Sequence, residues 1–71
     1  MQDFSMALGP KVEERRRVLG LGQEELAELA DVSVRFVRTL EHGKSSVRLD
    51  KVLDVLDVLG LDLDVRVRSP R

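Results

Sequence analysis

Two short amphipathic segments, residues 23–30 and 34–42, are separated by only about three residues, and this spacing constrains the fold more than any other feature. Ser33 is a good N-cap for the second segment, and Gly43 is a good terminator. Asp31 falls in the turn between the segments, where aspartate tolerates left-handed backbone geometry. Two short helices joined by so tight a turn form a helix-turn-helix, so the sequence predicts a mainly α fold built around this unit.

A further helix is expected on each side of this unit. The first, residues 8–19, would carry Pro10 in its first turn, where the missing N–H costs nothing, and would stop at Gly20. The second, residues 49–59, would end at Gly60 and is apolar on all but a narrow stripe, a wider apolar surface than three short helices can cover. The stripe consists of Asp50, Asp54 and Asp57, whose helical spacing is typical of a solvated face rather than of a metal or catalytic site.

After Gly60 the sequence alternates strictly between apolar and charged residues, which is the period of a strand with one buried face. We expect this strand to lie on the apolar surface of the last helix, and to pair antiparallel with the same strand of a second copy. In such a pair Asp62 and Asp64 of one chain would lie near Arg66 and Arg68 of the other. The predicted dimer interface comprises Leu61, Leu63, Val65 and Val67 of the strand together with Leu56 and Leu59 of the helix.

The length of 71 residues fits one small domain, which buries only about 60% of its unfolded surface and is marginal alone. The chain has no cysteine and one histidine, which excludes disulfides and thiolate or multi-histidine metal sites. Oligomerisation remains as a source of stability. The sequence therefore divides into a loosely ordered N-terminus, residues 1–7, a helical domain, residues 8–59, and a strand and tail that dimerise, residues 60–71.

No segment approaches the roughly 20 apolar residues of a membrane span, and the N-terminus lacks the charged start and apolar run of a signal peptide. We therefore expect a cytoplasmic protein. The sequence also lacks a Ser-His-acid set, a glycine-rich phosphate loop and a metal-ligand cluster, so we expect no enzymatic activity and no cofactor.

The charges are unevenly placed, although the net charge is only −1. Residues 33–48 hold four arginines or lysines against one glutamate, whereas residues 24–31 hold four acids and no base. Local patches of this kind matter more than the total charge for attracting a polyanion.

The predicted third helix has two distinct sides. At 100° per residue, Phe36, Val37 and Leu40 fall on one side, which is a core face, and Val34, Arg35, Arg38, Thr39 and His42 fall on the other. An arginine can bond both acceptors of guanine, and a threonine or valine can contact a thymine methyl group. The second side is therefore a candidate DNA-reading face.

The stretch GQEELAELADVSVRFVRTLEHGK resembles the helix-turn-helix of the phage-repressor-like (Xre) family, the lambda-repressor-like fold. The matching features are Gln23 at the start of the second helix, Leu26-Ala27 within it, Val32-Ser33 before the third, and Glu41 with Gly43 at its end. The match extends upstream to Arg16, which in this family pairs with the glutamate that matches Glu41. The sequence departs from the family at Gly22, in place of a hydroxyl cap, and at Asp31, in place of a turn glycine.

This resemblance implies roles for individual residues. The base-reading positions of the family fall on Val34, Arg35 and Thr39, with Arg38 adjacent, and the phosphate-positioning residues fall on Gln23, Ser33, His42, Lys44 and Ser46. Ser45 lies on the same loop as Lys44 and Ser46, and we expect it to hold the DNA backbone with them. Gln23 would lie at a helix N-terminus, which favours a phosphate group. The run from Arg15 to Arg17 is interpreted as a solvated helix face that contributes one internal salt bridge, between Arg16 and Glu41.

Residues 49–65 are similar to the HipB-like antitoxins of type II toxin–antitoxin modules. This narrower resemblance implies a homodimer whose strands form an intersubunit sheet. Such a dimer would bind a palindromic operator, repress its own operon and neutralise a HipA-like kinase toxin. Two alternatives stay open: a free-standing phage or plasmid regulator without a toxin, and a protein-interaction module whose strand adds to the sheet of a partner.

Overall fold

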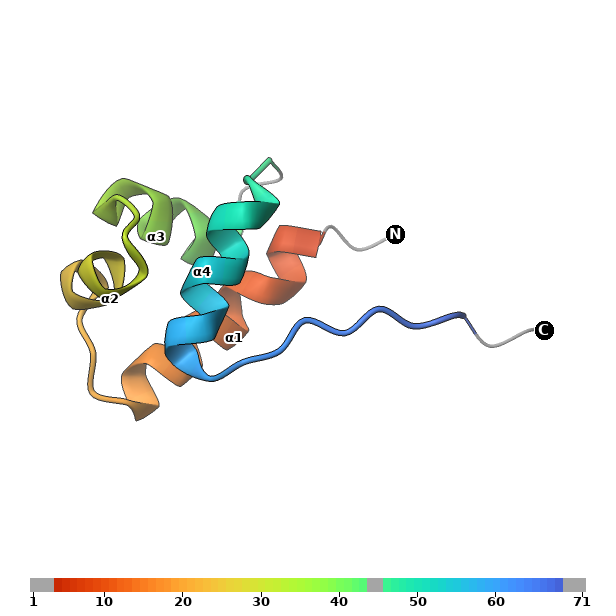
Figure 1. Cartoon of the computed structure of the whole chain (residues 1–71), viewed down its shortest axis with the longest axis horizontal. Coiled ribbons are helices and arrows are strands. Elements are labelled where there is room, and N and C mark those ends of the chain that lie inside the picture. Colours follow the sequence, from red (N-terminus) through yellow and green to blue (C-terminus); the bar gives the residue numbers. More distant parts are fainter. Residues whose placement is uncertain (1–3, 44–45, 69–71) are drawn as a thin grey trace.

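Four helices make up the folded part of the chain in a computed structural model that describes residues 4–43 and 46–68. The helices are α1 (Phe4–Val18), α2 (Gln23–Ala30), α3 (Val34–Glu41) and α4 (Leu49–Leu59). α1 and α4 cross each other, α2 and α3 lie together on one side of them, and the chain after α4 runs outward on the other side (Figure 1). None of the described helices is long and apolar enough to cross a membrane.

The helix-turn-helix forms where the sequence predicts it, because its ends have local stop and start signals. Asp31 ends α2 with left-handed backbone angles, φ 57° and ψ 45°, and its N–H bonds back to the carbonyls of Ala27 and Glu28. The Ser33 hydroxyl then accepts a hydrogen bond from the Phe36 N–H at 3.0 Å, which caps α3. The turn between the two helices has three residues, as predicted.

The fourth helix has the predicted bounds, but the first helix does not. α1 begins at Phe4 instead of residue 8, so residues 4–7 are helical, and residues 1–3 lie outside the described residues. Pro10 therefore lies inside α1 and not in its first turn. The prediction took Pro10 as a start signal. Proline removes one helical hydrogen bond, and α1 accommodates this loss because Leu8 and Val12, on either side of Pro10, both pack against the core.

The core consists of apolar side chains from all four helices. Its buried members are Val12, Leu26, Ala27, Ala30, Val37, Leu40, Val52, Val55, Leu56 and Leu59. Leu56 and Leu59, which the sequence assigned to a dimer interface, are 2% and 1% exposed within the single chain, so that assignment was wrong. The small side chains of Ala27 and Ala30 bring α2 close to α4. Together, α1 and α2 cover most of the apolar surface of α4 that was expected to stay open.

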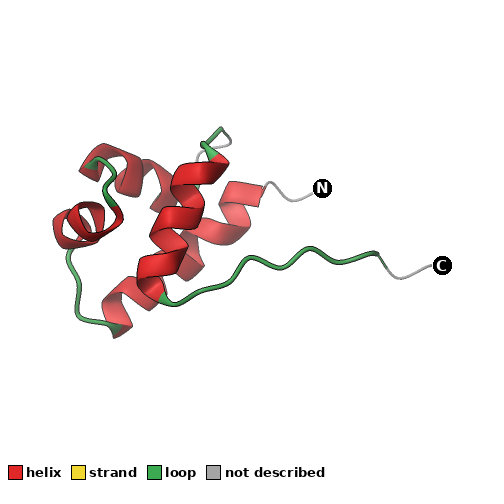
Figure 2. Ribbon diagram, viewed as in Figure 1, coloured by secondary structure: helices red, strands yellow, loops and turns green. Residues whose placement is uncertain are grey.

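The predicted C-terminal strand is not present in the described residues. Residues 61–68 are extended without a ladder (Figure 2), because a strand needs a second strand to bond with. Leu61 packs against the core, and Leu63 lies beside Ala7 and Leu8 of α1 rather than on α4. Two further residues contact little of their own chain, since Val65 is 90% and Val67 97% exposed. The expectation that all four apolar tail residues cover α4 was therefore wrong.

A glycine sets the contact between α1 and α3. A Cβ atom placed on Gly9 would lie 2.7 Å from the carbonyl oxygen of Leu40 and 2.8 Å from that of Glu41. Both distances are shorter than a real Cβ contact, and both oxygens belong to the backbone, so no side-chain movement could relieve them. Only a glycine at this position lets α1 pack this closely against the C-terminal end of α3.

An ion pair beside this contact joins the same two helices. Arg16 Nε donates to Glu41 Oε2 at 2.6 Å and Arg16 Nη2 to Glu41 Oε1 at 3.0 Å, with the two side chains 9% and 5% exposed. Arg16 Nη1 donates to the carbonyl of Leu21 at 2.9 Å, and Gln23 Nε2 donates to Glu41 Oε1 at 3.1 Å. The pair therefore connects α1, α2 and α3 at one point.

The surroundings of Glu41 lower the pKa of its carboxyl. Burial raises this pKa, but the hydrogen bonds from Arg16 and Gln23 and the charges of Arg16 and Arg17 outweigh burial, so the pKa lies below the ordinary value of 4.5. The same hydrogen bond raises the pKa of the Arg16 guanidinium. Both groups are therefore charged at neutral pH, and each is the other's counter-charge.

The two arginines next to Arg16 are also engaged within the chain. Arg15 Nε donates to the carbonyl of Leu59 at 2.9 Å, where a cation is favourable because the negative end of the α4 dipole lies there. Arg17 Nη2 lies 2.9 Å from Glu13 Oε2, one helical turn earlier. All three arginines of this run thus have partners inside the protein.

Gly9→Ala should lower the free energy of unfolding by about 1–3 kcal/mol, since the new methyl group overlaps two backbone carbonyls. The direction of this change in unfolding free energy is informative, because a glycine-to-alanine change in an unstrained helix stabilises the protein by about 0.4–1 kcal/mol. Urea unfolding followed by circular dichroism measures the change. The control is Glu14→Ala, an exposed position of the same helix, for which we expect a change within about 0.5 kcal/mol. A stabilised Gly9→Ala protein would contradict the close contact.

Glu41→Gln should lower the free energy of unfolding by about 1–3 kcal/mol at pH 7, because Arg16 loses its buried counter-charge. The folded-state pKa of Glu41 lies below the unfolded value, so the ion pair stabilises the fold above that value and is lost as the pH falls through the folded pKa. The difference between the wild type and Glu41→Gln should therefore narrow below a pH of about 4.5. Urea titrations from pH 7 to pH 3 test this, with the exposed Glu28→Gln as the control. A gap independent of pH would exclude an ionised Glu41 as its source.

Candidate nucleic-acid interface

The third helix presents one polar side to solvent and buries the other. Val37 and Leu40 are fully buried, and Phe36 is half-buried against the core. On the opposite side Arg35, Arg38 and His42 are exposed, whereas Val34 and Thr39 are half-buried at its edges. The five residues predicted to face outward from this helix therefore all have solvent access, with the two arginines the most prominent.

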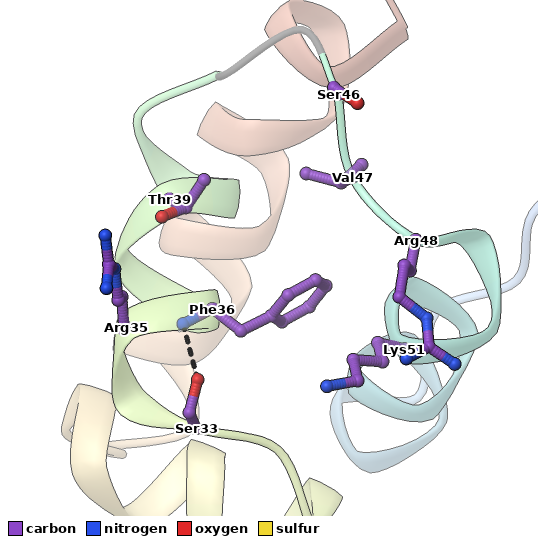
Figure 3. Close-up of a pocket in the computed structure, with 8 residues that line it drawn as sticks. All are labelled: Ser33, Arg35, Phe36, Thr39, Ser46, Val47, Arg48 and Lys51. Atoms are coloured by element: carbon purple, nitrogen blue, oxygen red, sulfur yellow. Dashed lines mark hydrogen bonds between the residues drawn. The ribbon is translucent and has the colours of Figure 1, made fainter.

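A shallow hollow of about 280 Å³ lies between α3 and the start of α4 (Figure 3). Its lining residues are Ser33, Arg35, Phe36, Thr39, Ser46, Val47, Arg48 and Lys51. The ring of Phe36 reaches from α3 toward α4 and forms the apolar wall of the hollow (Figure 3), and Lys51 Nζ lies 6.0 Å from the ring centroid. The hollow therefore combines an apolar wall with hydroxyl groups and three cations.

Two of these cations come from α4 and from the residue before it. The sequence singled out neither Arg48 nor Lys51 as a site residue. The charge run from Lys44 to Lys51 was a usable signal, because a basic loop followed by a basic first turn places cations beside the preceding helix. Arg48 Nη2 and Nε bond to Asp50 at 2.7 Å and 3.2 Å, and this hydrogen bond lowers the pKa of Asp50.

The remaining cations of the surface have no acidic partner. In residues 7–43 and 46–68, Arg35, Arg38 and Lys51 form no ion pair. The surface formed by α3 and the start of α4, which we call the basic face, consists of Arg35, Arg38, Thr39, Arg48 and Lys51. Its unpaired charges are available to an anionic ligand.

Gln23 links the basic face to the buried ion pair. Its amide nitrogen donates to Glu41 Oε1 at 3.1 Å, and its amide oxygen accepts from Arg38 Nε at 3.3 Å. Gln23 also occupies the first position of α2, where backbone N–H groups are free. The structure thus brings together a residue predicted to read bases and one predicted to hold a phosphate, and it fixes the orientation of the amide between them.

The other residues predicted to contact phosphates lie around the same surface. Ser33 is exposed at the start of α3, with its hydroxyl engaged as the cap, and His42 is exposed at the other end of the helix. Ser46 is exposed at the rim of the hollow. Lys44 and Ser45 lie outside the described residues.

The dimensions of α3 suit a groove of DNA. An α-helix with its side chains is roughly 10–12 Å across, and the major groove of B-DNA is about 12 Å wide and admits one. α3 is also the second helix of its helix-turn-helix, which is the position of the DNA-reading helix in that motif. Hydroxyl groups at both ends of the basic face can bond phosphate oxygens while the arginines reach toward base edges.

Comparisons with known proteins agree with this geometry. A family model described as a helix-turn-helix domain matches residues 7–68. A protein of Sinorhizobium fredii (strain NBRC 101917 / NGR234), described as an uncharacterized HTH-type transcriptional regulator y4mF, is 41% identical over 64 residues, which cover 90% of this chain and 84% of that protein. The chain belongs to the helix-turn-helix domain family.

Proposed function

We propose that the protein is a sequence-specific DNA-binding transcriptional repressor that binds a palindromic operator as a homodimer. The observation that carries this proposal is the basic face on the second helix of a helix-turn-helix, where Arg35 and Arg38 are exposed and have no acidic partner in residues 7–43 and 46–68. The similarity to an HTH-type transcriptional regulator supports the same class of function.

In this proposal α3 enters the major groove of the operator. Arg35 bonds the two acceptors of a guanine, and Val34 and Thr39 contact thymine methyl groups. Arg38 is held by Gln23, so it lies nearer the N-terminus of α2 than Arg35 does, and contacts the DNA at that edge of the groove. Sequence is read mainly by Arg35, because it is the arginine of α3 that lines the hollow beside Thr39.

Contacts to the DNA backbone hold the helix in place without reading sequence. The free N–H groups at the start of α2 and the side chain of Gln23 receive one phosphate. Ser33, His42 and the loop residues Lys44, Ser45 and Ser46 contact the backbone at the two ends of α3. Lys51 adds a cation at the edge of the hollow. The binding should weaken steeply with salt, because each neutralised phosphate releases counterions.

The extended tail supports a homodimer. Val65 and Val67 are apolar and almost fully exposed, and their burial requires another surface. A second copy related by a two-fold axis provides an antiparallel strand for the tail. Two α3 helices held roughly 34 Å apart by such a dimer would enter successive major grooves, which is why the operator is expected to be palindromic. A repressor then acts by occupying the promoter.

A narrower second candidate is the antitoxin of a type II toxin–antitoxin module, which would repress its own operon and neutralise a HipA-like kinase toxin. The support for this candidate is the likeness of residues 49–65 to HipB-like antitoxins. Whether a kinase-like protein is encoded beside this chain, and whether the two bind when they are co-expressed, decides between the antitoxin and a free-standing regulator. A stable complex that inhibits the kinase supports the antitoxin, and independent purification of the two proteins supports the regulator.

Selection of bound sequences from a random DNA pool tests the proposed function. A palindromic consensus with half-sites one helical turn apart is the expected result. The absence of any enriched sequence would contradict sequence-specific binding. A protein-interaction module that adds its tail to a foreign sheet would instead be a monomer in sizing experiments and would enrich no sequence.

Arg35→Ala should weaken binding to the selected operator by about 1–3 kcal/mol and relax the preference at one base pair of each half-site.

Lys51→Ala should weaken binding to the operator and to random DNA by the same factor, because a phosphate contact carries no sequence information. It should also flatten the salt dependence of binding. Fluorescence anisotropy with operator and random duplexes measures both changes. Arg17→Ala, in which the lost cation lies on α1 beside Glu13, is the matched control and should change neither affinity. Equal losses of Arg35→Ala on both duplexes would exclude a base-reading role.

Removal of residues 64–71 should give a monomer with poor operator affinity, since two linked α3 helices bind far more tightly than one. The deletion is designed to retain Leu61, because the Leu61 N–H bonds the carbonyl of Leu56 at 2.9 Å and the Leu61 side chain packs against the core. Helix content should therefore be unchanged in circular dichroism. Sedimentation measures the mass, and a tight dimer of the shortened chain would show that the tail is not the interface.

A further inference from the structure

We propose that the tail pairs with its copy in one specific register, with Val65 on the two-fold axis and Val67 of the partner subunit seated in an apolar hollow beside Leu63. This inference rests on the proposed homodimer and adds its alignment. It assigns an occupant to a surface that the single chain leaves open.

The pattern of charges along the tail selects this register. In an extended chain Leu61, Leu63, Val65 and Val67 share one face, and the four charged residues share the other. From an antiparallel alignment in which apolar residues lie opposite apolar residues, a shift of one residue places apolar residues opposite charged ones. Only every second alignment therefore keeps the two faces separate. Parallel pairing in register would place each charge opposite its own copy, which is repulsive.

Among the alignments that keep the faces separate, one has opposite charges at every pair. With Val65 opposite its own copy, Asp64 lies opposite Arg66 and Asp62 opposite Arg68, and symmetry repeats both pairs. A shift that brings Asp64 onto the axis places it opposite its own copy, and a shift that brings Arg66 onto the axis does the same for two arginines. Axes at Leu63 and Val67 place Asp62 opposite Asp64 and Arg66 opposite Arg68, respectively. The alignment about Val65 is thus the only one of the five without a like-charge pair.

The structure offers a matching surface on the apolar side. Ala7, Leu8, Lys11 and Leu63 line an open hollow of about 180 Å³ between α1 and the tail. In the alignment about Val65, the residue opposite Leu63 is Val67 of the partner subunit. The partner's Val67 therefore arrives beside Leu63, at the hollow, and its side chain is buried there instead of being 97% exposed. By the same symmetry, Val67 of this chain lies beside Leu63 of the partner subunit at the other end of the paired tails.

The geometry of the free tail is compatible with this arrangement. Leu63 lines a hollow together with α1, and the tail runs outward on the side opposite α2 and α3 (Figure 1). Val65 is 90% exposed, so a second tail can approach it. Asp64 Oδ2 and Arg66 Nε are 2.9 Å apart in the single chain, with both side chains largely exposed, so both are free to exchange this contact for the matching one across the pair.

Cysteine cross-linking of the full chain tests the register, because the chain has no native cysteine. Facing residues of antiparallel strands have Cα atoms about 4.5–5.5 Å apart, within the span of a disulfide. Val65→Cys should therefore form a disulfide with its own copy under mild oxidation. Leu63→Cys alone and Val67→Cys alone should not, since identical positions two residues from the axis are roughly 13 Å apart. A mixture of these two variants should form the mixed disulfide.

Charge reversal gives a second measurement that needs no disulfide. Arg66→Asp places two carboxylates opposite each other at both symmetry-related pairs, and should raise the dissociation constant of the dimer by roughly tenfold. Asp64→Arg combined with Arg66→Asp exchanges the two charges and should restore the wild-type value within about threefold. Val67→Ser should weaken the dimer as well, whereas Val18→Ser, an exposed valine at the far end of α1, should not.

The outcomes separate this inference from the proposed function. A dimer in which Leu63→Cys or Val67→Cys cross-links with itself faster than Val65→Cys overturns the register and leaves the homodimer standing. A failure of the double charge exchange to restore the dimer likewise overturns the register. A chain that stays monomeric at high concentration overturns the homodimer too, while its DNA selection still tests the basic face independently.

Discussion

The buried ion pair between Arg16 and Glu41 is the contact on which the remainder of the structure depends. It joins α1 to α3, and Leu21 and Gln23 complete its hydrogen bonds from the segment that begins α2. Removing two charges from water is costly, and the cost is offset only where the geometry is bidentate and the remaining donors and acceptors are paired. Both conditions hold here, because Glu41 accepts three hydrogen bonds and no buried side-chain nitrogen or oxygen in the described residues lacks a partner. The ion pair therefore fixes how three helices are oriented relative to one another.

That orientation has a direct connection to the basic face. The amide nitrogen of Gln23 donates to Glu41, and its amide oxygen accepts from Arg38. The buried ion pair and the exposed Arg38 therefore belong to one hydrogen-bond network. Partners that position functional groups in this way reduce the ordering needed when a ligand binds. In a protein of this size the core and the functional surface share a helix, because α3 contributes Val37 and Leu40 to the core and Arg35 and Arg38 to the surface.

The parts of the fold that the sequence predicts well are those with local signals. Ser33, Asp31 and Gly60 each act within one helical turn, and the helices that they delimit have the predicted ends within one residue. Pro10 misled the prediction of α1, since a proline signals a helix start only when nothing upstream packs. Leu56 and Leu59 were assigned to an interface because helical periodicity indicates an apolar face but not which neighbour covers it. Lys51 was missed because its place beside Phe36 depends on how α3 and α4 meet.

The contact at Gly9 has a consequence for how this gene can change over time. Every single-nucleotide change that replaces a glycine codon by that of another amino acid adds at least a Cβ atom, and here that atom would meet two carbonyl oxygens of α3. Drift at this codon is therefore confined to synonymous changes, or to changes accompanied by a shift of the helix pair. Glu14 on the same helix is exposed and has no such restriction. One missing methyl group thus sets the mutational tolerance of this single position of α1.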